Sequence, residues 1–217
     1  MKYKWLFFDL DGTISNTLEG VTNAAEYTFE KLGEVNFDRS LVRQFIGPPL
    51  QYSFEVLCGF SAEKTVRATQ IFREYYGARG WRECQLFDGM KSLLESLVEA
   101  GYHLAVATSK SEAYALPLLE MLGVRDCFEF ISGSCDDIGR TSKSDVIEHA
   151  LKTLGILPCD ALMIGDTKYD IEGANAYGLD SVGVLFGFGS RQSLEDEGAT
   201  YIAESVSHLG EMLLACK

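Results

Sequence analysis

The chain has 217 residues, of which 47% are hydrophobic and 24% charged, a composition typical of a soluble globular protein with a full hydrophobic core. The formal net charge of −13 argues against nucleic-acid binding, which depends on an excess of Lys and Arg near phosphates. No apolar stretch approaches the length of a membrane span, and the start of the chain lacks the apolar core of a signal peptide. The six cysteines lack the C-x-x-C pairing of zinc sites. We therefore expect a cytoplasmic protein with reduced thiols and no membrane partner.

Short apolar runs bounded by turn residues predict the strands of a buried parallel sheet. The predicted strands are Trp5–Phe8, Leu104–Ala107, Phe128–Ile131, Ala161–Ile164 and Ser181–Leu185. Apolar residues at helical spacing predict helices between them, over Gly89–Ala100, Ala113–Leu122 and Val146–Leu154. The alternation of strands and helices predicts an α/β fold in which helices cover both faces of the sheet.

The segment between the first two predicted strands interrupts this alternation, because it contains helical patterns and no convincing strand. These patterns cover residues 18–32, 40–45, 50–57 and 62–76. We therefore expect a Rossmann-like parallel-sheet core made of residues 1–16 and 85–217, with a helical-bundle domain of residues 17–84 inserted into it.

Four carboxylates follow two of the predicted strands. Asp9 and Asp11 lie in FFDLDGT after the first strand, and Asp166 and Asp170 lie in MIGDTKYD after the fourth. Open parallel sheets bind ligands at the carboxyl ends of their strands, and carboxylates gathered there repel one another unless a cation holds them together. Oxygen ligands without a neighbouring His or Cys favour Mg²⁺ over zinc.

The first carboxylate cluster has the residue types that a nucleophilic mechanism needs. Asp9 is placed to act both as a metal ligand and as a nucleophile, and Asp11 to protonate a leaving oxygen and then activate a water. Gly12 allows the backbone to turn tightly beside a substrate. Two alternatives are an ordinary Asp-Gly turn and a calcium loop, although the twelfth position of such a loop would hold Gly20 instead of Glu.

Two further segments offer groups that would complement a phosphate. Thr108 and Ser109 end the strand in VATSK, where a hydroxyl and backbone N–H groups can form a phosphate cradle, although Ser109 also suits a plain helix cap. Lys143 precedes a predicted helix and could neutralise a nucleophile and phosphoryl oxygens, the alternative being an exposed surface lysine. Asp170 would lie one turn into its helix and face Asp166 or Lys143, with helix capping as its alternative.

Taken in order, FFDLDGT, VATSK, Lys143 and IGDTKYD resemble the four motifs of the haloacid-dehalogenase-like (HAD) superfamily. The inserted helical segment resembles the C1 cap of its phosphoglycolate-phosphatase-like members. Within that branch, FIGPPL, REYY and the late GFGS look most like a subgroup of 5′-nucleotidases. The resemblance implies a Mg²⁺-dependent phosphatase that acts on a small phosphorylated metabolite.

The resemblance also implies a role for each motif residue. Asp9 would attack phosphorus and form an aspartyl-phosphate, while Asp11 would act as general acid and then base and would bind Mg²⁺ through its main-chain carbonyl. Asp166 would ligate the metal with the support of Asp170. The remaining residues would hold or neutralise the phosphoryl group: Thr108, the Ser109 amide and Lys143.

Asp11 separates the branches of the superfamily, because dehalogenases and phosphonatases lack this second acid. A β-phosphoglucomutase-like phosphomutase shares Asp9 and Asp11 and stays an alternative, as does a non-catalytic phosphate-binding protein. Among phosphatase substrates, a nucleoside 5′-monophosphate is the first candidate and phosphoglycolate the second, from resemblance alone. In the cap, the turn at Gly47 and Pro48 is expected either to touch the substrate or to form a rigid helix entry. The sequence leaves the oligomeric state open.

Overall fold

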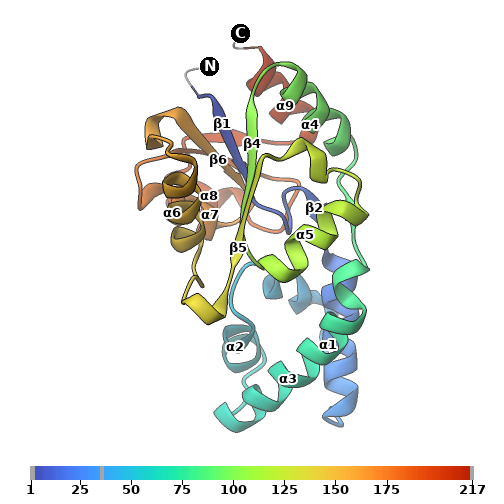
Figure 1. The fold of residues 1–217 in the computed structure, drawn as a ribbon. Coiled ribbons are helices and arrows are strands. Elements are labelled where there is room, and N and C mark those ends of the chain that lie inside the picture. The colour runs from blue at the N-terminus through green and yellow to red at the C-terminus, as the bar shows by residue number, and fades with distance from the viewer. Residues whose placement is uncertain (1–2, 35–36, 216–217) are drawn as a thin grey trace. The chain divides into compact units, whose positions relative to one another are not determined.

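The computed structural model describes residues 3–34 and 37–215 (Figure 1). The chain divides into two compact units, Met1–Ser15 with Leu86–Lys217, and Asn16–Gln85. The chain passes between the units in two short strands, β2 (Ser15–Asn16) and β3 (Gln85–Leu86), which form a two-stranded sheet. The assignment of these units as a catalytic core and a cap stays a prediction.

The first unit is built on a six-stranded sheet in the order β5-β4-β1-β6-β7-β8, in which every strand pair is parallel. The strands are β1 (Trp5–Phe8), β4 (His103–Ser111), β5 (Phe130–Ser134), β6 (Ala161–Gly165), β7 (Asp180–Val184) and β8 (Tyr201–Ala203). β1 lies between β4 and β6, with Phe8 opposite both Val106 and Ile164. The predicted α/β class and parallel sheet are confirmed.

Helices cover both faces of this sheet. They are α4 (Met90–Glu99), α5 (Glu112–Met121), α6 (Lys143–Leu154), α7 (Lys168–Asn175), α8 (Arg191–Asp196) and α9 (Val206–Leu214), with short 3₁₀ turns at η4 (Arg125–Cys127), η5 (Asp136–Ile138) and η6 (Pro158–Asp160). Figure 1 shows α6 and α7 on one side of the sheet and α4, α5 and α9 on the other. Alternate strand residues point to opposite faces, so Phe7 and Met163 pack in one core cluster with Val146 and Ile147 of α6.

Several strands differ from the sequence prediction. β5 covers Phe130–Ser134 instead of Phe128–Ile131, and the two-residue strands β2 and β3 were not predicted. β4 continues to Ser111, beyond the expected end at Ala107, and its pairing with β5 is irregular over this stretch. Thr108 and Ser109 therefore lie in the last part of an extended strand, and α5 begins only at Glu112. β8 was not predicted, because a three-residue edge strand is too short to show a periodicity.

The second unit is helical. Its elements are α1 (Leu18–Lys31), η1 (Arg39–Phe45), α2 (Leu50–Tyr52), η2 (Ser53–Leu57), α3 (Ala62–Ala78) and η3 (Gly80–Arg82). The segment predicted as one helix over 50–57 is instead a short α-helical turn followed by a π-helical turn. Phe54 is fully buried and makes edge or stacking contacts with Phe45, Phe60 and Phe72, so aromatic packing forms the centre of this unit.

Within the described residues, no helix is both long and apolar enough to cross a bilayer. The described cysteines are free thiols: Cys58, Cys84, Cys127, Cys135 and Cys159. The sixth, Cys216, lies outside the described residues.

Candidate active site

The candidate site lies at the carboxyl edge of three neighbouring strands, β4, β1 and β6. Asp9 directly follows β1, and its N–H donates to the carbonyl of Ile164 at 2.9 Å. Thr108 lies near the end of β4, and Asp166 directly follows Gly165, the last residue of β6. Because the strands are parallel, these residues from distant parts of the sequence come to one edge of the sheet, where open α/β sheets bind their ligands.

Three carboxylates at this edge form a buried acidic cluster. Asp9, Asp166 and Asp170 each contribute one oxygen to a group whose atoms all lie within 4.8 Å of one another. Asp166 and Asp170 are fully buried, and Asp9 is 7% exposed. Burial raises the pKa of Asp166 well above its usual range, and the neighbouring charges of Asp170 and Asp9 raise it further. Such a group is unfavourable without a cation, and its oxygen donors fit a hard divalent ion.

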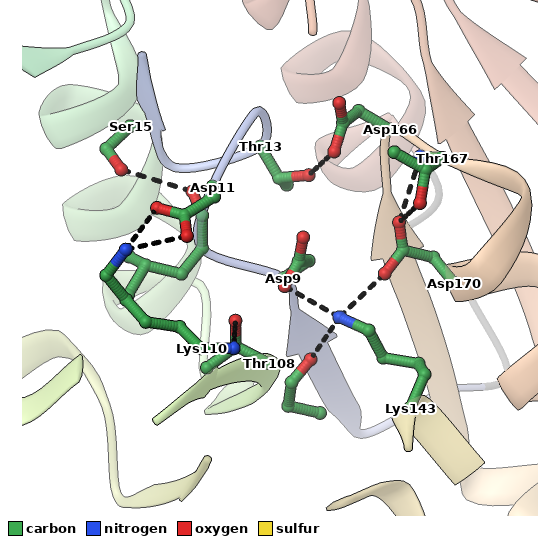
Figure 2. A network of polar contacts seen from close by, with 12 residues as sticks. Asp9, Asp11, Thr13, Ser15, Thr108, Lys110, Lys143, Asp166, Thr167 and Asp170 are labelled. Carbon is green, nitrogen blue, oxygen red and sulfur yellow. Dashed lines mark hydrogen bonds and ion pairs between the residues drawn. The ribbon is translucent and has the colours of Figure 1, made fainter. Parts of the chain in front are cut away.

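The ammonium of Lys143 joins two members of this acidic cluster. Its Nζ lies 2.7 Å from Asp9 Oδ1 and 2.8 Å from Asp170 Oδ1, and it donates to the carbonyl of Ala107 at 3.1 Å (Figure 2). Burial by itself would lower the pKa of Lys143, but the carboxylates of Asp170 and Asp9 outweigh it and raise the pKa above its usual value. Lys143 is therefore a buried cation at the first position of α6, and the alternative of an exposed surface lysine is wrong.

Neutral donors orient the two fully buried carboxylates. The backbone N–H and hydroxyl of Thr167 donate to Asp170 Oδ2 at 2.9 and 3.0 Å. Asp166 Oδ1 accepts from the Thr13 hydroxyl at 3.3 Å, and its Oδ2 accepts from the N–H of Phe188 at 2.8 Å. The donors Thr13, Thr167 and Phe188 were not predicted from the sequence, but the capping alternative given for Asp170 is confirmed, because Asp170 forms a capping box with Thr167 at the start of α7.

Three glycines leave the space that the buried carboxylates occupy. A Cβ on Gly12, whose φ is +91°, would lie 2.2 Å from Asp166 Oδ2. A Cβ on Gly165 would lie 2.2 Å from Asp170 Cγ, and one on Gly187 would lie 2.3 Å from Asp166 Cβ. All three separations are much shorter than a van der Waals contact. Any side chain larger than hydrogen at these positions would therefore displace the carboxylates.

The side chain of Asp11 lies outside the acidic cluster and pairs with Lys110. The Lys110 Nζ is 2.9 Å from Asp11 Oδ1 and 2.7 Å from Oδ2 (Figure 2). The side chain of Lys110 is 4% exposed and that of Asp11 is 24% exposed. Asp11 was predicted as a metal ligand through its main-chain carbonyl, and that role stays a prediction. Lys110 was given no role from the sequence, although it stands in the VATSK motif.

The remaining residues expected to bind substrate lie in both units. Thr108 is buried, and its hydroxyl oxygen accepts from the Lys110 N–H at 3.2 Å, which leaves the hydroxyl hydrogen able to point elsewhere. Ser109 is exposed. Gly47 and Pro48 belong to the helical unit, between η1 and α2, and their contact with a substrate stays a prediction.

The carboxylates of the site outnumber its ammonium groups, and one divalent cation would balance the excess negative charge. Four carboxylates (Asp9, Asp11, Asp166 and Asp170) and two ammonium groups (Lys110 and Lys143) leave a formal charge of −2. A buried or half-buried site with this excess favours the binding of a cation with two positive charges. The donor set, its burial and its net charge therefore all fit Mg²⁺.

Comparison with known proteins identifies the family. Residues 6–184 match the family model described as haloacid dehalogenase-like hydrolase. The chain belongs to this family. The resemblance inferred from the four motifs is thereby confirmed, as is the prediction that the protein is an enzyme of the hydrolase type.

Relatives with phosphatase and kinase names share nearly the whole chain. The crystal structure of a predicted phosphatase from Clostridium acetobutylicum is 39% identical, with a TM-score of 0.90 over 98% of this chain and 99% of that one. The 5′-nucleotidase of Pseudomonas aeruginosa is 35% identical over 98% of this chain and 96% of its own length. Tyrosine-protein kinase PtkA of Mycobacterium tuberculosis is 36% identical over 96% of this chain and 72% of its own length. Proteins named phosphoglycolate phosphatase match at 24–28% identity.

Proposed function

We propose that this haloacid dehalogenase-like hydrolase is a Mg²⁺-dependent phosphatase that cleaves phosphate monoesters of small metabolites through an aspartyl-phosphate on Asp9. The observation that supports this most strongly is the buried cluster of Asp9, Asp166 and Asp170, joined by Lys143 at the carboxyl edge of the sheet. A fold that only needed stability would place apolar side chains there, because buried charges cost free energy unless they are paired.

The proposed metal site uses Asp9 and Asp166, with the main-chain carbonyl of Asp11 as the further ligand implied by the family resemblance and with Asp170 in support. Bound there, Mg²⁺ would supply positive charge to the phosphoryl oxygens and offset the repulsion between carboxylates. The close approach of the Asp170 oxygen to those of Asp9 and Asp166 also allows direct ligation by Asp170.

The first half of the reaction transfers the phosphoryl group to the protein. A carboxylate oxygen of Asp9 forms a bond to phosphorus while the bond from phosphorus to the ester oxygen breaks. Asp11 gives its proton to that leaving oxygen. Lys143, bonded to Asp9 Oδ1 at 2.7 Å, holds the nucleophile and stays positively charged beside the developing negative charge.

The second half releases inorganic phosphate. Asp11 takes a proton from a water molecule, whose oxygen attacks phosphorus as the bond from phosphorus to Asp9 breaks. Each half returns Asp11 to the protonation state that the next one needs. Thr108 is buried at the strand end with its hydroxyl hydrogen available, and with the Ser109 N–H it would donate to the phosphoryl oxygens in both halves.

The comparisons favour a nucleoside 5′-monophosphate as the substrate. The 5′-nucleotidase relative matches along nearly the full length of both chains at 35% identity, whereas the proteins named phosphoglycolate phosphatase are less similar. Phosphoglycolate is therefore the second substrate candidate. The kinase-named relative, at 36% identity, makes phosphate transfer from ATP to tyrosine a second candidate function on the same scaffold.

The test is a phosphate-release panel with Mg²⁺, using nucleoside 5′-monophosphates, phosphoglycolate, sugar phosphates and pyrophosphate. We expect release from at least one monoester and a fall of about a thousandfold or more in Asp9→Asn, since the nucleophile is lost. Asp196→Asn, which changes an exposed carboxylate of α8, is the matched control and should keep wild-type activity.

Three outcomes of this panel would contradict the proposal. Unchanged hydrolysis in a folded Asp9→Asn variant would exclude Asp9 as the nucleophile. Conversion of a sugar phosphate to an isomer without free phosphate would indicate a phosphomutase. Formation of phosphotyrosine from ATP and a tyrosine peptide, with no monoester cleaved, would favour the kinase function.

A further inference from the structure

A second lysine, Lys110, has a place in the site that the roles assigned above do not include. Its ammonium donates to both oxygens of Asp11, at 2.9 and 2.7 Å, and the paired residues lie 99 positions apart in the sequence. In Figure 2 this pair lies beside the network of Asp9, Lys143 and Asp170 as a separate ion pair. Lys143 thus pairs with Asp9 and Asp170, and Lys110 pairs with Asp11.

The two side chains of this pair are buried to different extents, and this difference suggests what Lys110 does for Asp11. The side chain of Lys110 is 4% exposed, whereas that of Asp11 is 24% exposed. A buried ammonium needs an anionic partner. Lys110 finds that partner in Asp11 and bonds to both of its carboxylate oxygens. The side chain of Asp11 is thus partly exposed while its oxygens are bonded to Lys110, and each oxygen keeps a second lone pair with which to hold or take a proton.

A carboxylate in a turn is otherwise poorly fixed. Asp11 follows β1 by three positions and lies at an isolated bridge with Ser15, and its side chain can rotate about two bonds. Lys110 comes from the extended end of β4, the strand paired to β1. A contact from a neighbouring strand of the sheet restricts this rotation, and general acid–base catalysis requires such restriction.

We propose that Lys110 is a positioning residue that holds the Asp11 carboxyl group in place for proton transfer to the leaving oxygen and from the attacking water. This inference rests on the proposed phosphatase function. It assigns Lys110 no contact with the substrate, because its ammonium is buried and engaged by both oxygens of Asp11.

The test compares two esters that differ in their need for a proton. The oxygen of a nucleoside 5′-monophosphate must be protonated as it leaves, whereas p-nitrophenyl phosphate releases a stable phenolate without a proton. Because kcat/KM reports the steps up to the first irreversible one, it isolates the departure of the leaving group. In Lys110→Met we expect kcat/KM for the nucleotide to fall about a hundredfold, the lower end of acid–base contributions, and that for p-nitrophenyl phosphate to change little.

The second proton transfer gives an independent signature. In Lys110→Met, the attack of water on the aspartyl-phosphate should become slow for both esters. Rapid mixing with p-nitrophenyl phosphate should then show a burst of p-nitrophenolate, close to one equivalent per active site, followed by a slow steady rate. A lysine that only stabilised the fold would not produce a burst.

Three further variants control the comparison. Lys110→Gln keeps a donor that can reach Asp11 and should retain more of the nucleotide activity than Lys110→Met; it also serves as the test variant if the methionine protein does not fold. Lys152→Met alters an exposed lysine and should behave as wild type. In an Asp11→Asn background, Lys110→Met should cause no additional loss, because both changes act on the same proton transfers.

The outcomes separate this inference from the proposed function. Equal losses of kcat/KM on both esters, a raised KM with unchanged kcat, or additive losses with Asp11→Asn would overturn the role of Lys110 while leaving the phosphatase intact. An unaltered protein that releases phosphate from neither ester would instead overturn the proposed function, and the role of Lys110 with it.

Discussion

The site residues differ in how their buried charge is compensated. Lys143 pairs with Asp9 and Asp170, and Lys110 pairs with Asp11. Asp166 is fully buried, and the contacts described for its oxygens are a hydroxyl and a backbone N–H. Its pKa is raised well above the usual range because of burial and of the charges of Asp170 and Asp9. Asp166 is therefore the carboxylate that gains most from a bound cation.

This compensation predicts that Mg²⁺ stabilises the folded protein through Asp166. At a Mg²⁺ concentration about 100 times the dissociation constant, the gain in the free energy of unfolding should be about 2.7 kcal/mol. In Asp166→Asn we expect the protein without Mg²⁺ to be at least as stable as wild type, because the amide carries no charge, and the Mg²⁺-dependent gain to disappear. Thermal denaturation with and without MgCl₂ measures both, with Asp196→Asn as the control. An Asp166→Asn protein that keeps the full gain would exclude Asp166 as a ligand.

Individual site residues can be predicted from the sequence where their neighbours in the chain already indicate their chemistry. Asp9 and Asp166 are visible because a carboxylate directly after a buried apolar strand has few structural explanations. Lys143 is ambiguous in the sequence, since only the fold shows that it is buried beside Asp9. The pairing of Lys110 with Asp11 could not be predicted, because the two residues lie 99 positions apart in the sequence.

Among the elements, the loop after β7 shows how a backbone segment serves the site. In this loop the Ser190 hydroxyl accepts from the Ser193 N–H and caps the start of α8. The same loop also directs the N–H of Phe188 to Asp166 Oδ2 at 2.8 Å. That second function depends on tertiary contact and leaves no local signal.

We predict that Gly187→Ala weakens Mg²⁺ binding by displacing Asp166. The added Cβ would lie 2.3 Å from both Asp166 Cβ and the carbonyl oxygen of Gly12, and overpacking of this kind costs about 1–3 kcal/mol of stability. Isothermal titration with MgCl₂ should show a raised dissociation constant.

A matched glycine tests whether this effect is specific to the loop. At Gly210, in α9, a Cβ would meet only the flexible end of Leu93 at 3.2 Å, so Gly210→Ala should leave Mg²⁺ binding unchanged. Equal Mg²⁺ affinity in the two variants would show that the loop does not position Asp166.

For the whole molecule, hydrophobic periodicity predicted the five strands β1, β4, β5, β6 and β7 and the helices α4, α5 and α6 in order, because the central strands are buried on both faces, but it did not predict α7, α8 or α9. It failed where structure depends on distant partners. The extension of β4 to Ser111 requires pairing with β5, and β8 requires pairing with β7. The helical insert was recognisable as helical, but the sequence pattern did not distinguish the π-helical turn at Ser53–Leu57, which contains the buried Phe54, from an α-helix.

The central claim is that Asp9 forms a bond to phosphorus. The most direct measurement is to quench the protein in acid during turnover of its best monoester, reduce it with borohydride, and locate the modified residue by peptide mass spectrometry. We expect borohydride to convert an aspartyl-phosphate at position 9 to homoserine, and expect no such product in Asp9→Asn. Turnover with residue 9 unmodified, or with the phosphoryl group trapped on another side chain, would contradict the account.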